Sequence, residues 1–259
     1  MTTEDDYIAF EGVRKSFGEQ PVLRGIDLNI HRDETLVVLG ASGGGKSVIL
    51  RHILGLEKPD EGTVRVDGAN ITHLGERQLA PMRRNIGVLF QNGALFDSMN
   101  VFHNVAFPLR EAKVRDKDEI VTRVRNSLDV VGLADQMEKM PSNLSGGMRK
   151  RVALARAIVS RPHCVLYDEP TAGLDPVATT TIDELILRLQ RDYEVCSVVV
   201  THHLESARRI AGRIAFLHEG TIRFLGTPAE LDTSEDPVVQ NFIAGRATGA
   251  DSGDEIAKN

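Results

Sequence analysis

Cysteine, excess positive charge and long hydrophobic runs are all scarce in this sequence, and each absence narrows the class of protein. Only Cys164 and Cys196 occur among 259 residues, both within apolar stretches typical of buried strands. Two isolated thiols argue against the disulfide framework of a small secreted domain. They favour reduced cysteines in an intracellular protein.

The charge balance gives no support to nucleic acid as a default partner. Lys and Arg number 31 against 37 Asp and Glu, for a formal net charge of −6. Proteins that bind nucleic acid usually carry a positive field over part of their surface. No global field of that sign is present, although local basic patches stay open.

Apolar runs such as 35–39 and 198–200 are far shorter than the roughly 20 residues of a membrane-spanning helix. The first residues, Met-Thr-Thr-Glu-Asp-Asp, lack the basic and apolar regions of a secretory signal. We therefore expect a cytosolic chain that takes part in any membrane process through a partner.

Strand-like runs alternate with helical stripes along most of the chain, which predicts a layered α/β fold. Several runs are continuously apolar, as in parallel strands covered on both faces. The helical stripes include 120–131 and 182–189. The predicted strands are 8–13, 22–30, 35–39, 63–66, 86–90, 165–167, 197–201, 214–218 and 221–225.

Strand signals disappear between about residues 91 and 161, which predicts a helical subdomain inserted in the α/β core. We expect one main domain over 7–232 and a C-terminal extension over 233–259 with a mobile tip. A short apolar helical pattern at 237–243 needs a surface to cover. We favour the neighbouring copy for that surface, with the chain's own subunit as the alternative.

A glycine-rich segment, GASGGGKS, follows strand 35–39 and opens a helix that runs to about residue 54. Its backbone N–H groups and the helix N-terminus suit phosphate oxygens, whereas a chance Gly-rich turn lacks this context. Lys46 is expected to reach the β- and γ-phosphates, and Ser47 to bind Mg²⁺. The predicted phosphate-binding residues are Gly40, Ser42, Gly43, Gly44, Gly45, Lys46, Ser47 and Val48.

Two acids, Asp168 and Glu169, end the apolar run that begins at Cys164. Taken alone, such a pair is usually a solvated turn. Downstream of a phosphate loop, Asp168 suits a Mg²⁺-linked role through water, and Glu169 suits a general base that polarises the attacking water.

The segment LSGGM precedes the helical stretch 149–159. Ser145 can cap this helix while Gly146 and Gly147 expose backbone N–H groups, which makes a second phosphate-binding surface. A plain helix cap is the alternative. One chain needs only one such surface per nucleotide, and the first glycine-rich segment already provides it.

Together, GASGGGKS, Gln91 after Phe90, LSGGM, VLYDEP, GLDP and VTHH resemble, in this order, the ATP-binding-cassette (ABC) nucleotide-binding domain over about residues 10–231. The resemblance implies a P-loop NTPase with a RecA-like core, and ATP and Mg²⁺ as cofactors. It also implies a head-to-tail pair of copies, in which each ATP lies between the P-loop of one copy and the LSGGM segment of the other.

Further roles follow from the resemblance alone. Phe17 matches the aromatic residue that stacks on adenine, although a core position is the alternative, and Gln91 matches the sensor of γ-phosphate and Mg²⁺. Asp175 matches the dimer-contact loop, and His202 the switch histidine. Because adjacent strand residues point to opposite faces, His202 and His203 do not suit a shared metal. The implied sets are Lys46, Glu169 and His202 for catalysis; Ser47, Gln91 and Asp168 for metal; and Ser145, Gly146, Gly147 and Asp175 for ATP across the dimer.

Three positions depart from the commonest pattern of the family: Met148, Val48 and His203. None of these changes removes a phosphate-binding, metal-binding or water-activating group. A nucleotide-binding scaffold without turnover would be expected to lose Glu169, His202 or the LSGGM glycines. We therefore expect hydrolysis.

The segment 91–109, together with GKSV and LSGGM, resembles the ATPase of the maintenance-of-lipid-asymmetry transporters. This implies a multi-span permease, a mammalian-cell-entry lipid-binding protein and a peripheral place on the cytoplasmic face of the inner membrane. Phospholipid is the expected cargo, and a sterol or other hydrophobic molecule the alternative. Phe96, Phe102 and Phe107 either receive a helix of the permease or fill the subdomain core. A soluble ABC ATPase acting on nucleic acid or ribosomes is the alternative of another class. Such a protein would usually bring a coiled coil, a zinc element or a second cassette, and the sequence shows none of these signals.

Overall fold

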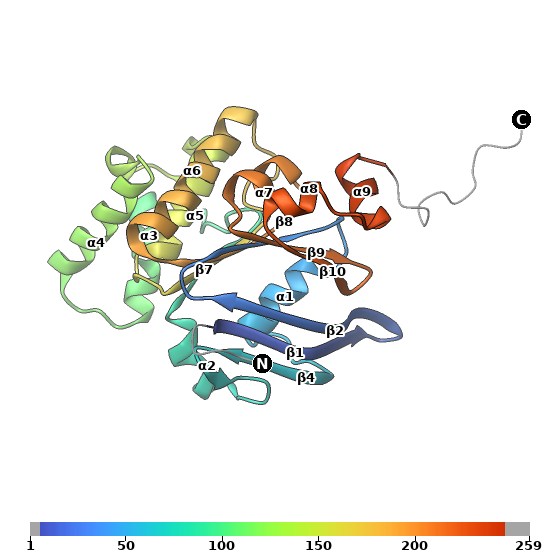
Figure 1. The fold of residues 1–259 in the computed structure, drawn as a ribbon. Helices are drawn as coiled ribbons and strands as arrows, with labels where there is room; N and C mark the ends of the chain where they lie inside the picture. The colour runs from blue at the N-terminus through green and yellow to red at the C-terminus, as the bar shows by residue number, and fades with distance from the viewer. Residues whose placement is uncertain (1–5, 247–259) are drawn as a thin grey trace, which may run out of the picture.

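A computed structural model describes residues 6–246, which form two β-sheets and the helices that pack against them (Figure 1). The antiparallel sheet has the order β2-β1-β4-β5, with β1 (Asp6–Phe17), β2 (Gln20–His31), β4 (Glu61–Val66) and β5 (Ala69–Asn70). The larger sheet has the order β10-β9-β3-β8-β7-β6, with β3 (Thr35–Leu39), β6 (Ile86–Leu89), β7 (Cys164–Asp168), β8 (Cys196–Thr201), β9 (Arg213–His218) and β10 (Thr221–Gly226). Every strand predicted from the sequence is present. The two-residue strand β5 is too short to give a sequence signal.

The larger sheet is parallel from β6 to β9, and only β10 runs antiparallel. Both of its faces are covered. Leu36 and Val38 of β3 pack into one hydrophobic core, while Val37 and Leu39 pack into the other. Since side chains alternate between the faces of a strand, a strand covered on both sides has to be apolar throughout. The predicted α/β fold is confirmed.

Helix α1 (Lys46–Ile53) lies between the two sheets, where it contacts β4, β7 and β8 (Figure 1). Ile49 and Ile53 are fully buried on its core-facing side. The helix ends at Ile53 with Leu54 as its cap, and the next residue, Gly55, has a φ of 62° in the left-handed region that favours glycine. The end predicted for this helix from the sequence is therefore confirmed, and its start is fixed directly after the glycine-rich segment.

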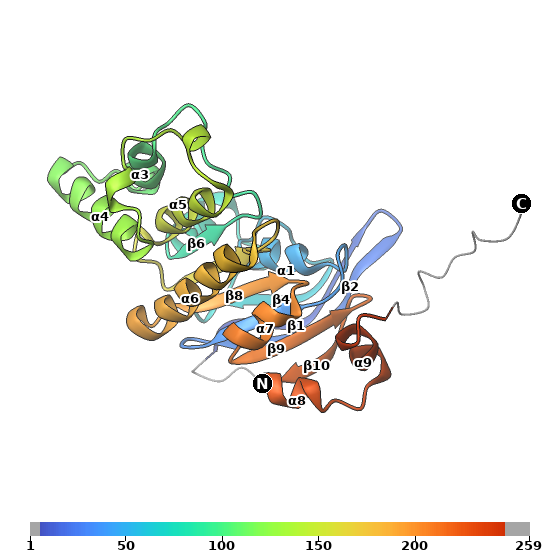
Figure 2. The same ribbon diagram turned by 90° about the horizontal axis from the view of Figure 1, so that it is seen from above.

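The chain between β6 and β7 contains α-helices and no strand: α3 (Val101–Glu111), α4 (Lys117–Val130) and α5 (Gly146–Ile158). Figure 2 shows these helices gathered at one end of the molecule, and β10, α8 and α9 at the other. The remaining helices are α2 (Glu76–Arg83), α6 (Pro176–Tyr193), α7 (Leu204–Ile210), α8 (Pro228–Asp232) and α9 (Pro237–Ile243).

Helix α9 packs against its own subunit. Val239 is fully buried, and the rings of Phe242 and Phe216 have their centroids 4.9 Å apart. Val238 and Ile243 also pack against the main core. The apolar pattern at 237–243 is thus satisfied within one chain, which corrects our preference for the neighbouring copy. The expected mobile tip, residues 247–259, lies outside the described residues.

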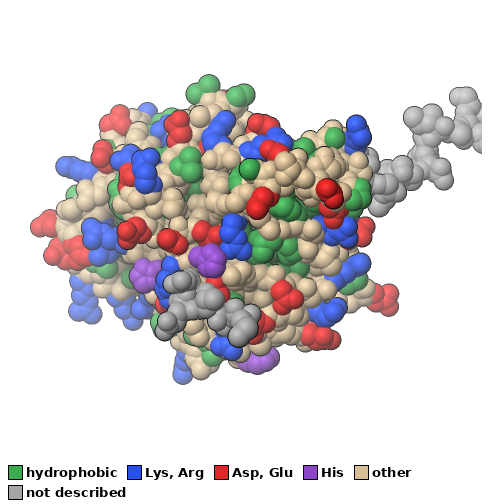
Figure 3. Space-filling model, viewed as in Figure 1, with side chains coloured by type: hydrophobic (Ala, Val, Ile, Leu, Met, Phe, Trp, Pro, Cys, Tyr) green, Lys and Arg blue, Asp and Glu red, His purple; other side chains and the backbone are tan. Residues whose placement is uncertain are grey.

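Acidic and basic side chains are interspersed over the face of the molecule drawn in Figure 3. Among residues 6–246, no helix is both long and apolar enough to cross a membrane. Cys164 and Cys196 are free and buried on the adjacent strands β7 and β8. Burial raises the pKa of the Cys164 thiol well above its usual value, so the expected structural role of the cysteines agrees with their surroundings.

Candidate nucleotide site

The parallel sheet brings three sequence motifs to one edge. Leu39 at the end of β3 pairs with Thr201 at the end of β8, and Asp168 at the end of β7 pairs with Val200. The segments that follow these strands therefore meet at the carboxyl edge of the sheet, where α/β proteins commonly bind ligands.

A cavity of about 450 Å³ opens at this edge. Its lining contains most of the residues that the sequence predicted to bind nucleotide and metal: Phe17, Ser42, Gly43, Gly45, Lys46, Ser47, Val48, Gln91, Asp168, Glu169 and His202. Gly40 and Gly44 belong to the same loop but do not line the cavity. At Gly40, an added Cβ would lie 2.4 Å from the carbonyl oxygen of Leu217, so only glycine fits there.

Three further residues line the cavity that the sequence did not single out: Gln20, Val22 and Arg51. Arg51 lies one helical turn after Ser47 on α1, so the helical period could have found it. Gln20 and Val22 come from β2, in the other sheet, and nothing in the local sequence places that hairpin over the glycine-rich loop.

Lys46 is buried, and its Nζ donates to the backbone carbonyls of Gly40 at 3.0 Å and Ala41 at 2.9 Å. The loop carbonyls thereby hold the charged amino group of Lys46 in place. Gly43 and Gly45, at φ of 78° and 94°, give the backbone the left-handed turns that such a loop needs. A charged donor and turned-in backbone groups at the start of α1 suit a phosphate group.

Ser47 and Asp168 form the oxygen-rich part of the site. Ser47 Oγ donates to Asp168 Oδ1 at 3.0 Å, and Gln91 lines the same cavity. A hydroxyl, a carboxylate and an amide are hard oxygen donors. Mg²⁺ typically takes only one or two protein ligands and completes its octahedron with waters and phosphate oxygens. The residues present fit that ion.

Glu169 is held in an uncommon conformation. Its φ of 46° is left-handed, which is rare for a residue with a side chain. Its Oε2 accepts from Thr201 Oγ1 at 3.1 Å and from the His202 N–H at 3.3 Å, and lies 3.0 Å from His202 Nδ1. Its Oε1 lies 3.5 Å from Lys46 Nζ. The carboxylate is fixed beside the loop lysine, where a general base can act on a phosphate-bound substrate.

Ser145, Gly146, Gly147 and Asp175 lie outside the cavity. Ser145 caps α5, because its Oγ accepts from the Met148 N–H at 3.2 Å. Asp175 caps α6 in the same way, accepting from the N–H groups of Val177 and Ala178. The predicted helix start at Ser145 is confirmed. The fold of one chain does not bring these residues to the P-loop.

The two adjacent histidines have different surroundings. His202 lines the cavity, whereas His203 caps α7, where its Nδ1 accepts from the Ser206 N–H at 3.2 Å. Ser206 Oγ in turn donates to the buried Asp183 at 3.0 Å. An imidazole thus caps α7, a role that Ser, Thr, Asp or Asn side chains fill at most helix starts. No group of three or more possible His, Cys, Asp or Glu metal ligands occurs within residues 6–246.

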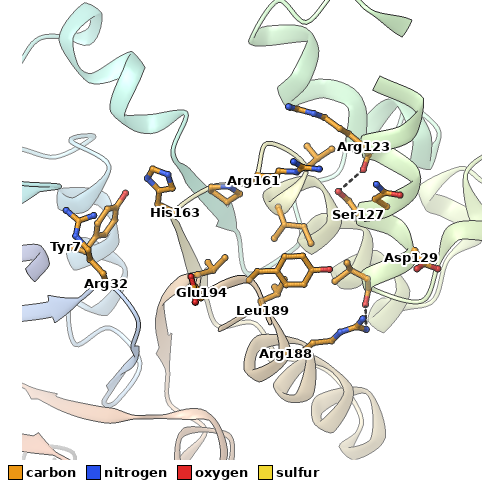
Figure 4. A pocket seen from close by; sticks show the side chains of 17 residues that line it. Tyr7, Arg32, Arg123, Ser127, Asp129, Arg161, His163, Arg188, Leu189 and Glu194 are labelled. Atoms are coloured by element: carbon orange, nitrogen blue, oxygen red, sulfur yellow. Dashed lines mark hydrogen bonds between the residues drawn. The ribbon is translucent and has the colours of Figure 1, made fainter. Parts of the chain in front are cut away.

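A larger cavity of about 790 Å³ lies elsewhere, lined by Tyr7 and Arg32 on one side and by Arg123, Ser127 and Asp129 of α4 on the other (Figure 4). Its lining includes residues directly before β7 and β8, so it faces the opposite edge of the sheet. It shares no residue with the nucleotide cavity, and size alone would have pointed to the wrong place.

The sequence is similar to those of known proteins of one family. The family model described as "ABC transporter" matches residues 23–172. The probable ribonucleotide transport ATP-binding protein mkl of Mycobacterium leprae (strain TN) is 40% identical over 242 residues, which cover 93% of this chain and 70% of that protein. The chloroplastic protein TRIGALACTOSYLDIACYLGLYCEROL 3 of Arabidopsis thaliana is 40% identical over 262 residues, covering 95% and 75%.

Solved structures show the same fold. The cbiO1 structure from Clostridium perfringens, part of the ABC transporter complex cbiONQ, superposes with a TM-score of 0.82 at 28% identity and covers 92% of this chain and 95% of that one. The dimeric ATP-binding cassette MJ0796, bound to ADP and Pi in a post-hydrolysis state, superposes at 0.78 with 32% identity and covers 85% and 98%. The predicted P-loop NTPase fold of the ABC type is confirmed. With the motifs in one cavity, the family model matched and the fold shared, this chain belongs to the ABC transporter family and carries its ATP-binding, ATP-hydrolysing domain.

Proposed function

We propose that this chain powers the movement of phospholipid, or of a related hydrophobic cargo, through a membrane permease. It acts as a pair of copies that close on ATP and reopen after hydrolysis. The observation that carries this proposal is an apolar, aromatic groove directly beside the nucleotide cavity, in the segment whose sequence resembles lipid-transport ATPases. We place the pair on the cytoplasmic face of the inner membrane.

At the P-loop, Lys46 exchanges its bonds to the Gly40 and Ala41 carbonyls for phosphate oxygens, and the loop N–H groups surround the same phosphates. Phe17, 42% exposed at the rim of the cavity, stacks on the adenine. Glu169 accepts a proton from the attacking water, and His202 holds the γ-phosphate and that water in line.

Ser47, Asp168 and Gln91 would hold Mg²⁺ through their side-chain oxygens. When bound, this ion neutralises charge on the β- and γ-phosphates. The 3.0 Å bond between Ser47 and Asp168 keeps both oxygens at the same corner of the cavity. Ser47 lies at the start of α1, so its hydroxyl moves with the loop that holds the phosphates.

Ser145, Gly146 and Gly147 complete the site of a second copy. They form the N-terminus of α5, yet the cavity of their own chain lies elsewhere. A two-fold pair of chains brings each such helix start to the other copy's ATP. Asp175, at the start of α6, lies in the loop that contacts the partner.

The groove has a volume of about 810 Å³ and lies between β6, α3 and α5. Phe90 and Phe96 in its lining are 45% and 40% exposed, and the Phe96 and Phe107 rings have centroids 4.8 Å apart. Phe107 thus lines the groove, while Phe102 packs against the core. Exposed aromatic side chains of this kind mark a binding surface.

The lining is basic as well as aromatic: it includes Arg83, Arg84, Arg123 and Arg156 against the single acid Glu111. Arg83 and Arg123 pair with Glu76 and Glu119 beside the groove, which leaves Arg84 and Arg156 without such a pair among the described residues. A short permease helix with an apolar face and acidic side chains fits this balance. Arg156 also donates to the carbonyls of Gly93 at 2.7 Å and Ala94 at 2.8 Å. It therefore ties the groove to the loop that follows Gln91, which is a direct route from nucleotide to permease.

The names of the relatives differ in the compound that they mention. One relative bears a glycolipid's name, while another is named for ribonucleotide transport. The methionine import protein MetN of Rhizobium etli is also 40% identical, over 218 residues. Methionine is therefore the second candidate. A lipid-binding protein of the mammalian-cell-entry type is the further partner that the lipid assignment requires.

A reconstituted complex tests the proposal. We expect the chain, assembled with its permease in vesicles, to hydrolyse ATP faster when phospholipid is supplied as cargo and to show no response to methionine. Phe96→Asp should uncouple the chain from the permease while ATP binding persists. Leu56→Asp is the matched control, because Leu56 is 56% exposed and lies outside the groove. Stimulation of hydrolysis by methionine alone would overturn the assignment of a lipid cargo. Equal effects of the two variants on coupling would overturn the proposal that the permease binds in the groove.

A further inference from the structure

Lys150 is a buried lysine on α5, the helix that begins at Ser145. The residue is only 6% exposed, whereas lysine is almost never fully buried without a partner. Its Nζ donates to the backbone carbonyl of Glu169 at 3.1 Å. The nearby carboxylate of Glu169 favours the charged amine, while burial lowers the pKa of Lys150 to about 8. An apolar side chain would fill this space without the cost of burying a cation.

The Glu169 backbone needs support, because a left-handed φ is costly for a residue with a side chain. Its N–H donates to the Val200 carbonyl at 2.9 Å, and its carbonyl also accepts from the Ala172 N–H at 3.2 Å. Lys150 adds a charged donor to the second lone pair of that carbonyl. In a buried place such a bond is stronger than at the surface.

Glu169 is thus held at both ends. Its carboxylate accepts hydrogen bonds from Thr201, the last residue of β8, and from His202, the next residue. Its backbone carbonyl accepts a hydrogen bond from Lys150 of α5. We propose that Lys150 is a positioning residue for Glu169: its bond fixes the backbone from which the carboxylate projects and ties that carboxylate to the helix that begins at Ser145. The inference rests on the proposed catalytic role of Glu169.

The first test separates positioning from general support of α5. Lys150→Met removes the donor and keeps the length of the side chain. We expect kcat to fall roughly 10- to 100-fold with KM for ATP changed less than about twofold, because a charged hydrogen bond is lost from the catalytic residue only. Lys150→Arg, which keeps charge and reach, should recover most of kcat.

Arg151→Met is the matched control. Arg151 is the next residue on α5, and its Nη1 donates to the Val131 carbonyl at 3.0 Å, so it makes the same kind of bond away from Glu169. Its loss should lower thermal stability and leave kcat nearly unchanged. If Lys150→Met does not fold, Lys150→Gln keeps a neutral, shorter donor and should give an intermediate kcat. Equal kcat in wild type, Lys150→Met and Arg151→Met would overturn the proposal.

Mixed dimers show on which site the lesion falls. If Lys150 acts on the Glu169 of its own chain, then Lys150→Met mixed with Ser145→Arg leaves one site intact, and activity returns in part. The mixture of Lys150→Met with Lys46→Ala then has no intact site and keeps only the reduced turnover of the Lys150→Met sites. If Lys150 instead only shapes the helix start at Ser145, the two results are exchanged, and the positioning role is refuted.

Two reference measurements distinguish failure of this inference from failure of the proposed function. Glu169→Gln must stop turnover, and the mixture of Lys46→Ala with Ser145→Arg must recover activity. If either reference fails, the proposed roles of Glu169 or of the shared sites are wrong. If both hold and Lys150→Met mixed with Ser145→Arg does not recover, only the Lys150 assignment is wrong.

Discussion

The P-loop region and the Ser145 region differ in how much of a binding site one chain supplies. Around Lys46, residues from both sheets, α1 and the segments after β6, β7 and β8 converge on one cavity. Ser145, Gly146 and Gly147 form a capped helix start outside that cavity. Both regions have the backbone and glycines of a phosphate site, but only the first lines the nucleotide cavity, together with Lys46, Asp168 and Glu169. A motif alone therefore does not make a site; the surrounding fold does.

The largest expected effect falls on the P-loop region. Glu169→Gln should keep ATP affinity and lower turnover by about 10²–10⁴-fold, because an amide cannot accept the proton of the attacking water. Steady-state hydrolysis and nucleotide binding by the assembled complex measure both quantities. ATP should also trap the closed dimer. Near-normal hydrolysis would contradict the role of Glu169.

The second prediction tests whether the two regions complement each other between copies. Lys46→Ala and Ser145→Arg should each be inactive alone. Mixed at equal amounts, they should recover about a quarter of wild-type turnover, since half of randomly paired dimers are mixed and each of those has one intact site of two. A mixture as inactive as the single variants would show that each chain's site is self-contained or that both sites must fire together.

The adjacent histidines sharpen the comparison at the scale of one residue. His202→Ala should lower turnover roughly 10- to 100-fold with little change in stability, because it removes a hydrogen-bonding group from the cavity. His203→Ala should cost about 1 kcal/mol of unfolding free energy through the lost cap of α7, and leave turnover within about twofold. Denaturant unfolding and hydrolysis assays on both variants separate the two roles. The reverse pattern would mean that the site is misassigned.

Helix α9 belongs to neither region, and its removal should affect stability more than chemistry. Phe242→Ala should lower the unfolding free energy by about 1–3 kcal/mol, since the partly buried ring packs on Phe216. ATP binding should persist. Thermal unfolding measures the stability, and light scattering of the ATP-bound form measures the mass of the particle and so the pairing. If the variant has unchanged thermal stability but loses pairing, then α9 acts between copies.

The last expected effect is a pH dependence of stability at Lys150. Burial lowers its pKa from 10.5 to about 8 in the folded chain. Between these values the unfolded chain binds the proton and the folded chain does not, so this group's contribution to stability rises as pH increases through that window. The stability of wild type relative to Lys150→Met should therefore increase from about pH 8 to about pH 10. Urea unfolding at several pH values measures it, and a flat or falling difference would contradict the assignment.

Much of this protein could be predicted from the sequence by itself. The continuous apolar runs determined the parallel strands, because a strand buried on both faces admits few polar residues. The order of GASGGGKS, LSGGM and VLYDEP determined the family and most of the cavity's lining. Gly55 and Ser145 marked the ends of helices, because caps depend on local backbone chemistry.

Only the tertiary structure decided how distant segments meet. It placed Gln20 and Val22 over the P-loop, set Lys150 against the Glu169 carbonyl and folded α9 onto Phe216. None of these contacts has a local signature in the sequence, because each joins segments that are far apart along the chain. Local pattern determined which elements form, and packing between elements decided which side chains share a site.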